Sequence, residues 1–307
     1  NSSPPYRWAL PFTRLKRETS FGKTLKGDLL SRLLSGKEQK EFFHFLERGN
    51  WLIFQDVYPQ MLLYEESINR HTNLFYLLPR FDVSKFMYVL WNHFWQTKDR
   101  YTLAIALVIN EQSYLEKRVI QNPLFQKTVL ETLKFQIQEL FSLNQILFPY
   151  KKTDEAKVIG QSIYHFSSLH DRILLGKRLY DLLFDETFYE QIYNWSIQQP
   201  HTGSRQDYWP EIFNDLNEST PEEPFKRRTR NCKLKPGANR IYSPKLQFAW
   251  SDVDHVAAEK GDWYQDWTVL QYLQKHIKKV NGDIYEDYCE TLERIELAII
   301  AKNAFLS

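Results

Sequence analysis

The sequence predicts an all-α protein, a compact array of about ten helices with a loop-rich C-terminal third. Apolar residues recur at spacings of three and four along most of the first two thirds of the chain, which is the period of amphipathic helices. Capping residues and prolines divide these apolar stripes into segments joined by short connections, as expected for antiparallel helical neighbours. No pair of segments alternates between apolar and polar residues in the way that predicts a β-hairpin.

The first half of the chain is predicted to form a series of helices. The apolar periodicity places them over 25–34, 35–49, 51–69, 85–97 and 101–121. Ser35, with Glu38 three residues later, forms a capping box for the second of these helices. We expect Gly49-Asn50 to end that helix and Pro59 to kink or restart the next one, because Gly and Pro are the poorest helix formers.

Helices are predicted in the second half as well. A long helix is expected over 124–148, where apolar residues keep helical spacing. These residues are Phe125, Val129, Leu133, Ile137, Leu140 and Leu147. Asp154 and Asp185 are expected to cap the following helices, over 155–184 and 186–199. Shorter elements are predicted further on: helices over 243–252, 267–279 and 284–305, and a small extended piece around 229–242.

The order of these elements indicates one domain with four parts. Residues 1–24 form an N-terminal extended segment, and 25–216 form the helical core. Residues 217–242 form an irregular basic loop, which we expect to be solvated because runs of like charge are usually exposed. Residues 243–307 form C-terminal helices packed on the core.

Composition argues against several classes of function. The formal net charge of +2 gives no general attraction to nucleic acid or to an anionic membrane. The densest apolar run, 101–109, is about half as long as a bilayer requires, so no membrane span is expected. The first five residues lack a basic region followed by an apolar one, so no signal peptide is expected. Cys232 and Cys289 lie far apart and form no metal-binding motif, so a reduced, cytoplasmic protein is the simplest interpretation.

Polar side chains interrupt the apolar faces of the predicted central helices. His93 shares the face of Leu90, Glu111 and Arg118 share one face of the next helix, and His170 lies on the apolar face of its own helix. Buried charges must be paired or must shift their pKa. We expect an internal polar network that fixes helix register, and the alternative is a cleft of perturbed catalytic groups. No metal-ligand spacing such as His-Glu-x-x-His occurs, so no metal site is predicted.

The stretch between the prolines at 200 and 210 is the strongest candidate for a binding surface. His201, Ser204 and Arg205 combine hydroxyl, imidazole and guanidinium groups on a flexible backbone, which suits a phosphate or a carboxylate. Asp207 can instead pair with Arg205 inside the loop, while Tyr208 anchors the loop on the core. The loop therefore predicts either an anion site or a turn clamped by an Arg–Asp pair.

Several motifs resemble a known family. They are Asn50-Trp51-Leu52-Ile53-Phe54-Gln55-Asp56, Tyr58-Pro59-Gln60, Trp91-Asn92-His93-Phe94-Trp95, Ile109-Asn110-Glu111-Gln112, His201-Thr202-Gly203-Ser204-Arg205 and Gly261-Asp262-Trp263. With these motifs the chain resembles, over most of 25–270, the YppC-like family of uncharacterised proteins from spore-forming bacteria. The resemblance implies a cytoplasmic bacterial protein and brings no established activity.

Two hypotheses of function follow. The first is a non-enzymatic binding or scaffold protein, whose loop at 200–210 takes an anionic small molecule or an acidic segment of a partner. The second is a hydrolase or transferase, in which His170 or His201 acts as acid or base and Glu111 or Asp171 orients it. In both, the candidate ligand-binding residues are His93, Arg118, Arg172, Ser204, Arg205, Asp207 and Tyr208. The sequence identifies no cofactor, since it contains no nucleotide-binding or phosphate-binding loop.

Overall fold

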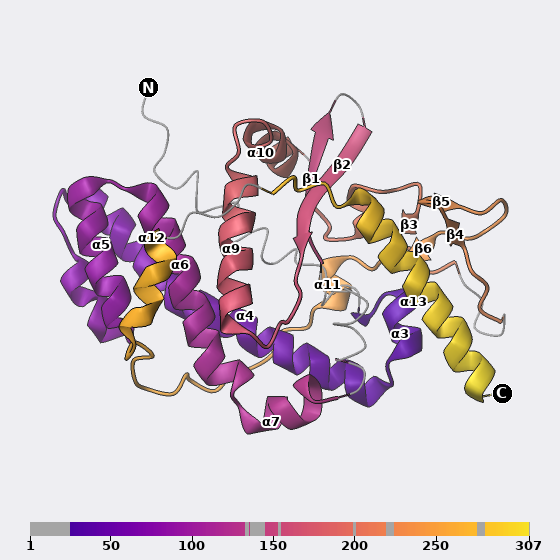
Figure 1. Cartoon of the computed structure of the whole chain (residues 1–307), viewed down its shortest axis with the longest axis horizontal. Helices are drawn as coiled ribbons and strands as arrows, with labels where there is room; N and C mark the ends of the chain where they lie inside the picture. Colours follow the sequence, from indigo (N-terminus) through magenta and orange to yellow (C-terminus); the bar gives the residue numbers. More distant parts are fainter. Residues whose placement is uncertain are drawn as a thin grey trace.

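Helices make up most of the protein in a computed structural model of the chain (Figure 1). The structure describes residues 25–132, 135, 145–152, 155–198, 201–218, 224–274 and 280–306. The predicted helical character is confirmed, but these residues also form three two-stranded sheets, so the fold is not purely all-α. The predicted N-terminal segment, 1–24, lies outside the described residues.

The longest helix, α4, confirms the predicted capping box. It runs from Gly36 to Asn69. The Ser35 hydroxyl accepts a hydrogen bond from the Glu38 backbone N–H at 3.3 Å, and the Glu38 carboxylate accepts one from the Ser35 N–H at 2.7 Å. The two residues therefore satisfy donors that an uncapped helix would leave free.

The predicted break of this helix is wrong. The helix continues through Gly49-Asn50, and Pro59 lies inside it. Leu52 and Leu63 lie before and after the proline, and both are buried. A continuous buried face thus outweighs the cost in helix propensity, about 1 kcal/mol for Gly and about 3 kcal/mol for Pro.

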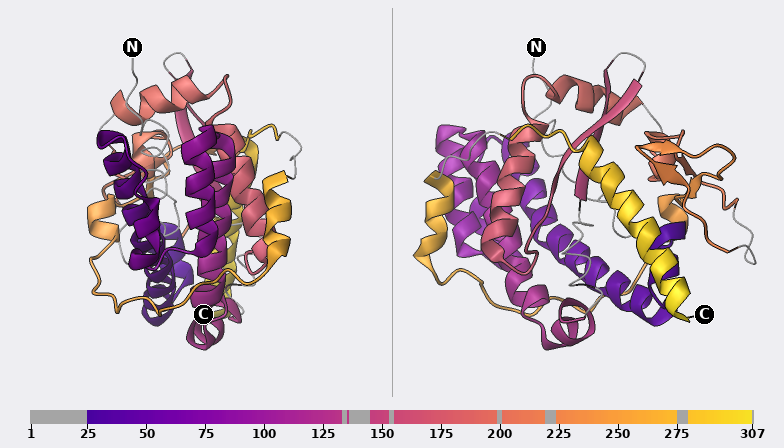
Figure 2. Two further views of the ribbon diagram at one scale, coloured as in Figure 1. Left: turned by 90° about the vertical axis from the view of Figure 1, so that its left-hand side faces the viewer. Right: turned by 45° about the vertical axis from the view of Figure 1, so that its right-hand side comes forward.

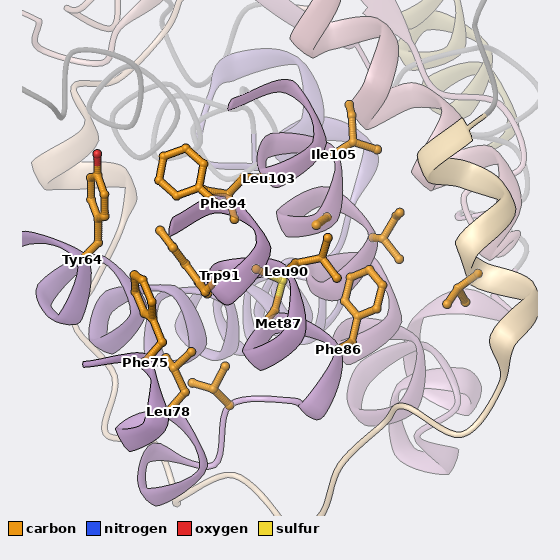
Figure 3. Packing of buried hydrophobic residues seen from close by; sticks show 14 of the residues in the cluster. Tyr64, Phe75, Leu78, Phe86, Met87, Leu90, Trp91, Phe94, Leu103 and Ile105 are labelled. Atoms are coloured by element: carbon orange, nitrogen blue, oxygen red, sulfur yellow. The ribbon is translucent and has the colours of Figure 1, made fainter. Parts of the chain in front are cut away.

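A cluster of aromatic and aliphatic side chains fills the core at one end of the molecule, which we call the helical end (Figure 3). Trp91 stacks on Phe75 with ring centroids 4.8 Å apart and meets Phe94 edge-on at 5.8 Å. The elements around this cluster are α4, the 3₁₀ helix η1 (Phe75–Phe81), α5 (Lys85–Thr97), α6 (Arg100–Leu115), the 3₁₀ helix η5 (Trp267–Leu270) and α12 (Gln271–Gln274).

The helix predicted over 101–121 is confirmed with one change of geometry. After α6 the backbone widens into a π-helical segment, η2 (Glu116–Ile120), which ends before Asn122. The Asn122 side chain then caps α7 (Pro123–Phe125), and a second π-helical segment, η3 (Gln126–Leu130), follows.

A β-hairpin replaces parts of two predicted helices. Strands β1 (Gln145–Lys152) and β2 (Glu155–Ser162) pair antiparallel, so the predicted helices over 124–148 and 155–184 are wrong in these segments. Val158 and Ile159 are β-branched and buried, and Pro149 cannot donate a helical hydrogen bond, so both segments favour a strand. The interior of the predicted helix over 124–148, with Leu133, Ile137, Leu140 and Asn144, lies outside the described residues, as does Asp154.

The remaining elements follow the predicted order. Helices α9 and α10 end the core, and the extended piece expected around 229–242 is confirmed as short strands. The elements are α3 (Asp28–Leu33), α9 (Leu169–Leu183), α10 (Tyr189–Gln198), η4 (Arg205–Asp207), β3 (Phe213–Asn214), β4 (Thr229–Arg230), β5 (Lys233–Leu234), β6 (Ile241–Tyr242), α11 (Leu246–Ala249) and α13 (Tyr285–Leu306). Strand β3 pairs parallel with β6, and β4 pairs antiparallel with β5.

Strands β3 to β6 and helix α13 form the opposite end of the molecule, which we call the sheet end (Figure 1; Figure 2, right). Its core joins residues that are far apart in the sequence: Leu29 of α3 packs in one cluster with Phe213, Ile241 and Leu292. The N-terminal part of the predicted core and the C-terminal helix thus share one hydrophobic cluster. The predicted boundaries of the four parts stay a prediction.

The prediction of two reduced cysteines is wrong. Cys232, in the turn between β4 and β5, forms a disulfide with Cys289 of α13, with a Cα–Cα distance of 5.2 Å. Polar contacts hold the same hairpin against α13, because Glu296 accepts hydrogen bonds from the Thr229 N–H at 3.0 Å and from the Thr229 hydroxyl at 2.7 Å. Folding therefore brings together two cysteines that are 57 positions apart in the sequence.

Over the part of the chain that the structure describes, no helix combines the length and the apolar character needed to cross a bilayer.

Candidate functional site

The loop predicted as a binding surface is clamped by Asp207. Its carboxylate accepts hydrogen bonds from the Thr202 N–H at 2.9 Å, the Thr202 hydroxyl at 2.8 Å and the Gly203 N–H at 3.0 Å. Gly203 has a φ of 78°, which only glycine adopts without strain. The clamp is thus made by Asp207 with the loop backbone, where the sequence predicts a pair with Arg205.

Arg205 and Ser204 point into the protein. Arg205 is 4% exposed, donates to the Tyr288 hydroxyl at 3.1 Å and lies over the Phe213 ring at 4.2 Å. The Ser204 hydroxyl, 2% exposed, donates to the Ser243 carbonyl. Both side chains fix the loop to β6 and α13, so their burial does not favour contact with a ligand. Their predicted ligand-binding role stays a prediction.

His201 lies at the other end of the loop. Its Nε2 is 3.0 Å from the carbonyl oxygen of Ser196, and its ring lies 4.3 Å from that of Trp195 in α10. The imidazole therefore packs against the end of α10, and its predicted catalytic role also stays a prediction.

The second half of the loop lines an open cavity of about 1030 Å³, which we call the groove. Four segments form most of its wall: strand β2, the turn and strand β5, the loop 207–212 and the segment 281–285 before and at the start of α13. Tyr150 of β1 and Phe188, just before α10, complete it. The lining residues are Tyr150, Lys157, Val158, Ile159, Phe188, Asp207, Tyr208, Trp209, Pro210, Glu211, Ile212, Cys232, Lys233, Leu234, Asn281, Asp283 and Tyr285. Figure 2 (right) shows β1–β2, α13 and the small strands next to one another.

Aromatic rings dominate the lining of the groove. Trp209 lies against Tyr285 with ring centroids 5.0 Å apart, and Tyr150 meets Phe188 edge-on at 5.5 Å. Tyr208 adds a fifth ring, which is half-buried. Such rings offer large apolar contact areas at low cost in side-chain entropy, which is typical of binding surfaces.

Charges of both signs surround these rings. Two lysines, Lys157 and Lys233, and three carboxylates, Asp207, Glu211 and Asp283, line the groove, which gives it a formal charge of −1. Asp207 already holds the loop backbone, and Asp283 accepts a hydrogen bond from the Tyr285 N–H at 3.2 Å. Among the groove residues the structure places no arginine, the side chain best suited to bind phosphate.

The predicted site residues of the helical end lie on α5, α6, η2 and α9, whereas Ser204 and Arg205 of the 200–210 loop contact Ser243 and Tyr288. His93 of α5 and His170 of α9 are exposed, so the prediction that they lie on buried faces is wrong. On α5, Val89 is 59% exposed, which shows that the buried face is centred on the other side, with Met87 and Phe94. His170 Nδ1 instead lies 2.8 Å from the Tyr272 hydroxyl of α12.

The remaining predicted residues have internal partners. Arg172 is buried and donates to the Phe166 carbonyl at 2.6 Å and to the carboxylate of Glu116. Arg118 is buried as predicted and donates to the carbonyl of Gly261 at 2.9 Å. Burial, only partly offset by Glu116, lowers the pKa of Arg172.

Two acids complete this set. Glu111 is buried in α6, as predicted, and Asp171 is half-buried at the start of α9, where its backbone N–H donates to the Ser168 hydroxyl. In the described ranges, no three His, Cys, Asp or Glu side chains lie close enough to hold a metal ion.

An internal polar network is centred on Asp56, and its members differ from the residues predicted for such a network, which were His93, Glu111, Arg118 and His170. Asp56 Oδ2 accepts hydrogen bonds from Asn110 Nδ2 at 2.6 Å and from Gln60 Nε2 at 2.7 Å. Asn110 Oδ1 accepts from the Trp263 Nε1–H at 2.7 Å, and Gln60 Oε1 accepts from the Trp91 Nε1–H at 2.8 Å. These bonds join α4, α5, α6 and the segment before α12, so the network fixes how these elements pack.

Burial raises the pKa of Asp56 to about 7, and the hydrogen bonds from Asn110 and Gln60 offset only part of that effect. The sequence analysis missed this residue, although Asp56 lies four positions after Leu52 and four before Gln60, on the buried face of α4. That spacing is the signal that identifies it.

Comparisons with known proteins place the chain in a family. The sequence profile of a family described as "Protein of unknown function (DUF2515)" matches residues 23–288. The uncharacterised protein YppC of Bacillus subtilis (strain 168) is 40% identical over 205 residues, which cover 66% of this chain and 63% of that protein. No solved structure matches the chain. The profile covers most of the chain and confirms the predicted resemblance: the protein belongs to the DUF2515 family, whose function is unknown.

Proposed function

We propose that the protein is a binding protein and that its groove takes an extended peptide segment of a partner. The observation that carries this proposal is the aromatic-lined groove of about 1030 Å³. Sites for small molecules have volumes of about 300–1,000 Å³, so an open groove at the upper limit of that range suits a longer ligand.

Strand edges at the groove support a peptide as the ligand. Strand β2 pairs with β1 along one edge, and on its other edge the Gly160 N–H donates to the Gly282 carbonyl at 2.8 Å. Backbone groups alternate in direction along a strand, so Val158 presents its N–H and C=O to the same edge as Gly160. Part of this edge is already taken, because Ile159 forms an antiparallel β-bridge with Asp283. Val158 lines the groove next to this bridge, and an extended peptide would add to the edge beyond it, as in β-augmentation.

The charges of the groove favour a peptide over a small anion. The lining has a formal charge of −1, and two of its three carboxylates are already hydrogen-bonded to backbone N–H groups. Recognition by this surface would rest on apolar contact and main-chain hydrogen bonds, with Lys157 and Lys233 available to an acidic side chain. The anionic small molecule predicted from the sequence stays a prediction.

The enzyme alternative has less support. It requires His93, Glu111, His170 and the 200–210 loop to line one cleft, whereas the two histidines are exposed and the loop packs against the sheet end. A hydrolase or transferase needs an acid or base within hydrogen-bond reach of its substrate. Among the described residues that line the groove there is no histidine, and two of its three carboxylates, Asp207 and Asp283, accept hydrogen bonds from backbone N–H groups.

The cytoplasmic location predicted from the sequence remains part of this proposal. A disulfide is rare in cytosolic proteins, where it is usually regulatory, and is common in oxidising compartments. Fractionation of cells that produce the protein decides between these settings: recovery with cytosolic markers supports the cytoplasmic location, and recovery outside the cytosol contradicts it.

Selection from a random peptide library tests the proposed function. The oxidised full chain is used as bait, and the affinities of synthetic copies of the selected peptides are measured by fluorescence polarisation. We expect Tyr285→Ala to weaken binding about tenfold, which corresponds to about 1.4 kcal/mol, because Tyr285 is 41% exposed at the groove. The matched control is Tyr76→Ala, which removes the same side chain from an exposed position in η1, outside the groove.

Binding that survives Tyr285→Ala unchanged, or a selection that yields no peptide, contradicts the proposal. Acidic residues in the selected peptides would support the acidic partner segment expected from the sequence. Lys233→Glu tests whether these acidic residues bind next to Lys233 in the groove.

A further inference from the structure

The Cys232–Cys289 disulfide lies in the wall of the groove. Cys232 is half-buried and belongs to the groove lining, together with its neighbours Lys233 and Leu234. Cys289 is 4% exposed in α13. The bond thus connects the part of the groove wall formed by the β4–β5 hairpin to the helix behind it.

The hairpin turn has a backbone geometry that its residues do not favour. Asn231 and Cys232 have φ angles of 50° and 60°, so both turn residues adopt the left-handed conformation of a tight β-hairpin turn. Asn tolerates this conformation, but the second position usually holds Gly, because a Cβ atom crowds the following carbonyl. Cys232 therefore depends on other contacts to remain in this conformation.

The base of the hairpin and its turn are held by different contacts. At the base, Glu296 accepts from the Arg228 and Thr229 N–H groups, and Arg228 also pairs with Asp28. At the turn, the disulfide and a hydrogen bond of 2.6 Å from the Asn231 N–H to the Glu293 carboxylate are the contacts to α13. Loss of the disulfide would leave the turn with the Asn231–Glu293 hydrogen bond but without its covalent link to α13, while the base stays attached.

We propose that the Cys232–Cys289 disulfide is a redox latch that keeps the groove in its binding-competent shape. This inference rests on the proposed function of the groove, and it specifies how that site is regulated. With the bond closed, Cys232, Lys233 and Leu234 stay in the groove wall. With the bond open, the turn relaxes from its left-handed conformation and the groove loses this wall.

The chemical step is thiol–disulfide exchange with a dithiol reductant. A thiolate of the dithiol attacks the sulfur of Cys232, the half-buried cysteine that lines the groove. A mixed disulfide forms there, and Cys289 leaves as a thiolate that takes up a proton. The second thiol of the reductant then attacks the first sulfur of the same reductant molecule, which is bonded to Cys232 in the mixed disulfide. This step closes the disulfide of the reductant and releases Cys232 as a thiol. The protein gains two electrons and two protons, and the reductant becomes a disulfide.

Binding and hydrogen exchange together test the latch. A peptide selected on the oxidised chain is titrated against the oxidised chain, the chain reduced by dithiothreitol, and a variant with Cys232→Ser and Cys289→Ser. We expect binding at least tenfold weaker in the last two samples, and faster amide exchange at 230–234 with little change at 85–115 in the helical end. Dithiothreitol should change nothing in the double variant, which controls for effects of the reagent. Circular dichroism confirms that each sample is folded.

The outcomes separate the latch from the groove itself. Equal peptide binding and equal exchange at 230–234 in oxidised and reduced protein overturn the latch and leave the proposed function intact. Alkylation of both cysteines in protein that has not been treated with a reductant also overturns the latch, because it shows that no disulfide is present. If no peptide binds the oxidised chain, the proposed function fails, and the latch that regulates it is overturned with it. If the double variant does not fold, reduction of the natural chain supplies the same comparison.

Discussion

Asp56 is a carboxylic acid enclosed by three helices, and its protonation is coupled to folding. Burial raises its pKa to about 7 in the folded chain, whereas an exposed Asp titrates near 3.9. Between these values the folded protein binds a proton that the unfolded chain does not bind, so stability falls as pH rises. A difference of about three pKa units corresponds to about 4 kcal/mol of unfolding free energy, lost between about pH 4 and pH 7.

Asp56→Asn is expected to remove this pH dependence. Asn is neutral and nearly isosteric, and its carbonyl oxygen can still accept from Asn110 and Gln60. Urea unfolding should show a variant that is more stable than the natural chain at pH 8, by about 2–4 kcal/mol, and similar to it at pH 4. A variant that is less stable at pH 8 would show that Asp56 works as a charged group, for example through its attraction to Arg118.

Arg205 gives a second test at the scale of one residue. Its guanidinium is buried over Phe213 and donates to Tyr288, so Arg205→Ala should lower the unfolding free energy by about 2–3 kcal/mol. Thermal unfolding with inorganic phosphate separates this structural role from the predicted anion site. We expect phosphate to shift the Tm of both proteins equally; a shift that occurs in the natural chain and disappears in the variant would support Arg205 as an anion anchor.

Single residues also show how far the sequence could predict the site. Helical spacing identified Glu111 and Arg118 as buried, because both lie on the strongly apolar face of α6 and its extension. The same argument was wrong for His93, because an apolar neighbour such as Val89 can itself be exposed. Spacing gives the faces of a helix, but the neighbouring elements decide which face is buried.

At the scale of elements, the β1–β2 hairpin depends on Gly160. A Cβ atom at this position would lie 1.9 Å from the backbone oxygen of Ile146 in the paired strand. Gly160→Ala should therefore cost at least about 2 kcal/mol of unfolding free energy and weaken peptide binding, because β2 forms a wall of the groove. The control is Gly36→Ala, which meets nothing within 4 Å at the start of α4 and should be neutral or stabilising by up to about 1 kcal/mol. Equal stabilities of the two variants would contradict this account of the hairpin.

The hairpin also marks the limit of prediction from sequence at this scale. Helices with long apolar stripes, such as α5 and α6 with its extension η2, were predicted with nearly correct bounds, and α4 was predicted as two helices. The segment 145–162 was not predicted correctly, because short apolar runs are compatible with both helix and strand. The hairpin is stabilised by packing against α9 and α10, and the apolar spacing within the segment does not reveal that packing. The disulfide was missed for the same reason, since only folding brings Cys232 to Cys289.

The whole molecule has two ends with different character. The helical end has a core of packed aromatic rings and the Asp56 hydrogen-bond network. The sheet end is built from short strands and loops, and residues of these segments line the groove (Figure 1). Loops on a rigid scaffold are the usual location of binding surfaces. The 201–210 loop lies at this end: its second half, Asp207 to Pro210, lines the groove, and Thr202 and Gly203 of its first half donate backbone N–H groups to Asp207.

The most direct test of the groove is a hydrogen-exchange footprint of the oxidised full chain with and without a selected peptide. If the groove is the binding site, the peptide slows exchange at 157–159, 207–212, 232–234 and 281–285 and leaves 85–115 unchanged. Protection confined to the helical end, or no protection at any of the four groove segments, would contradict the account.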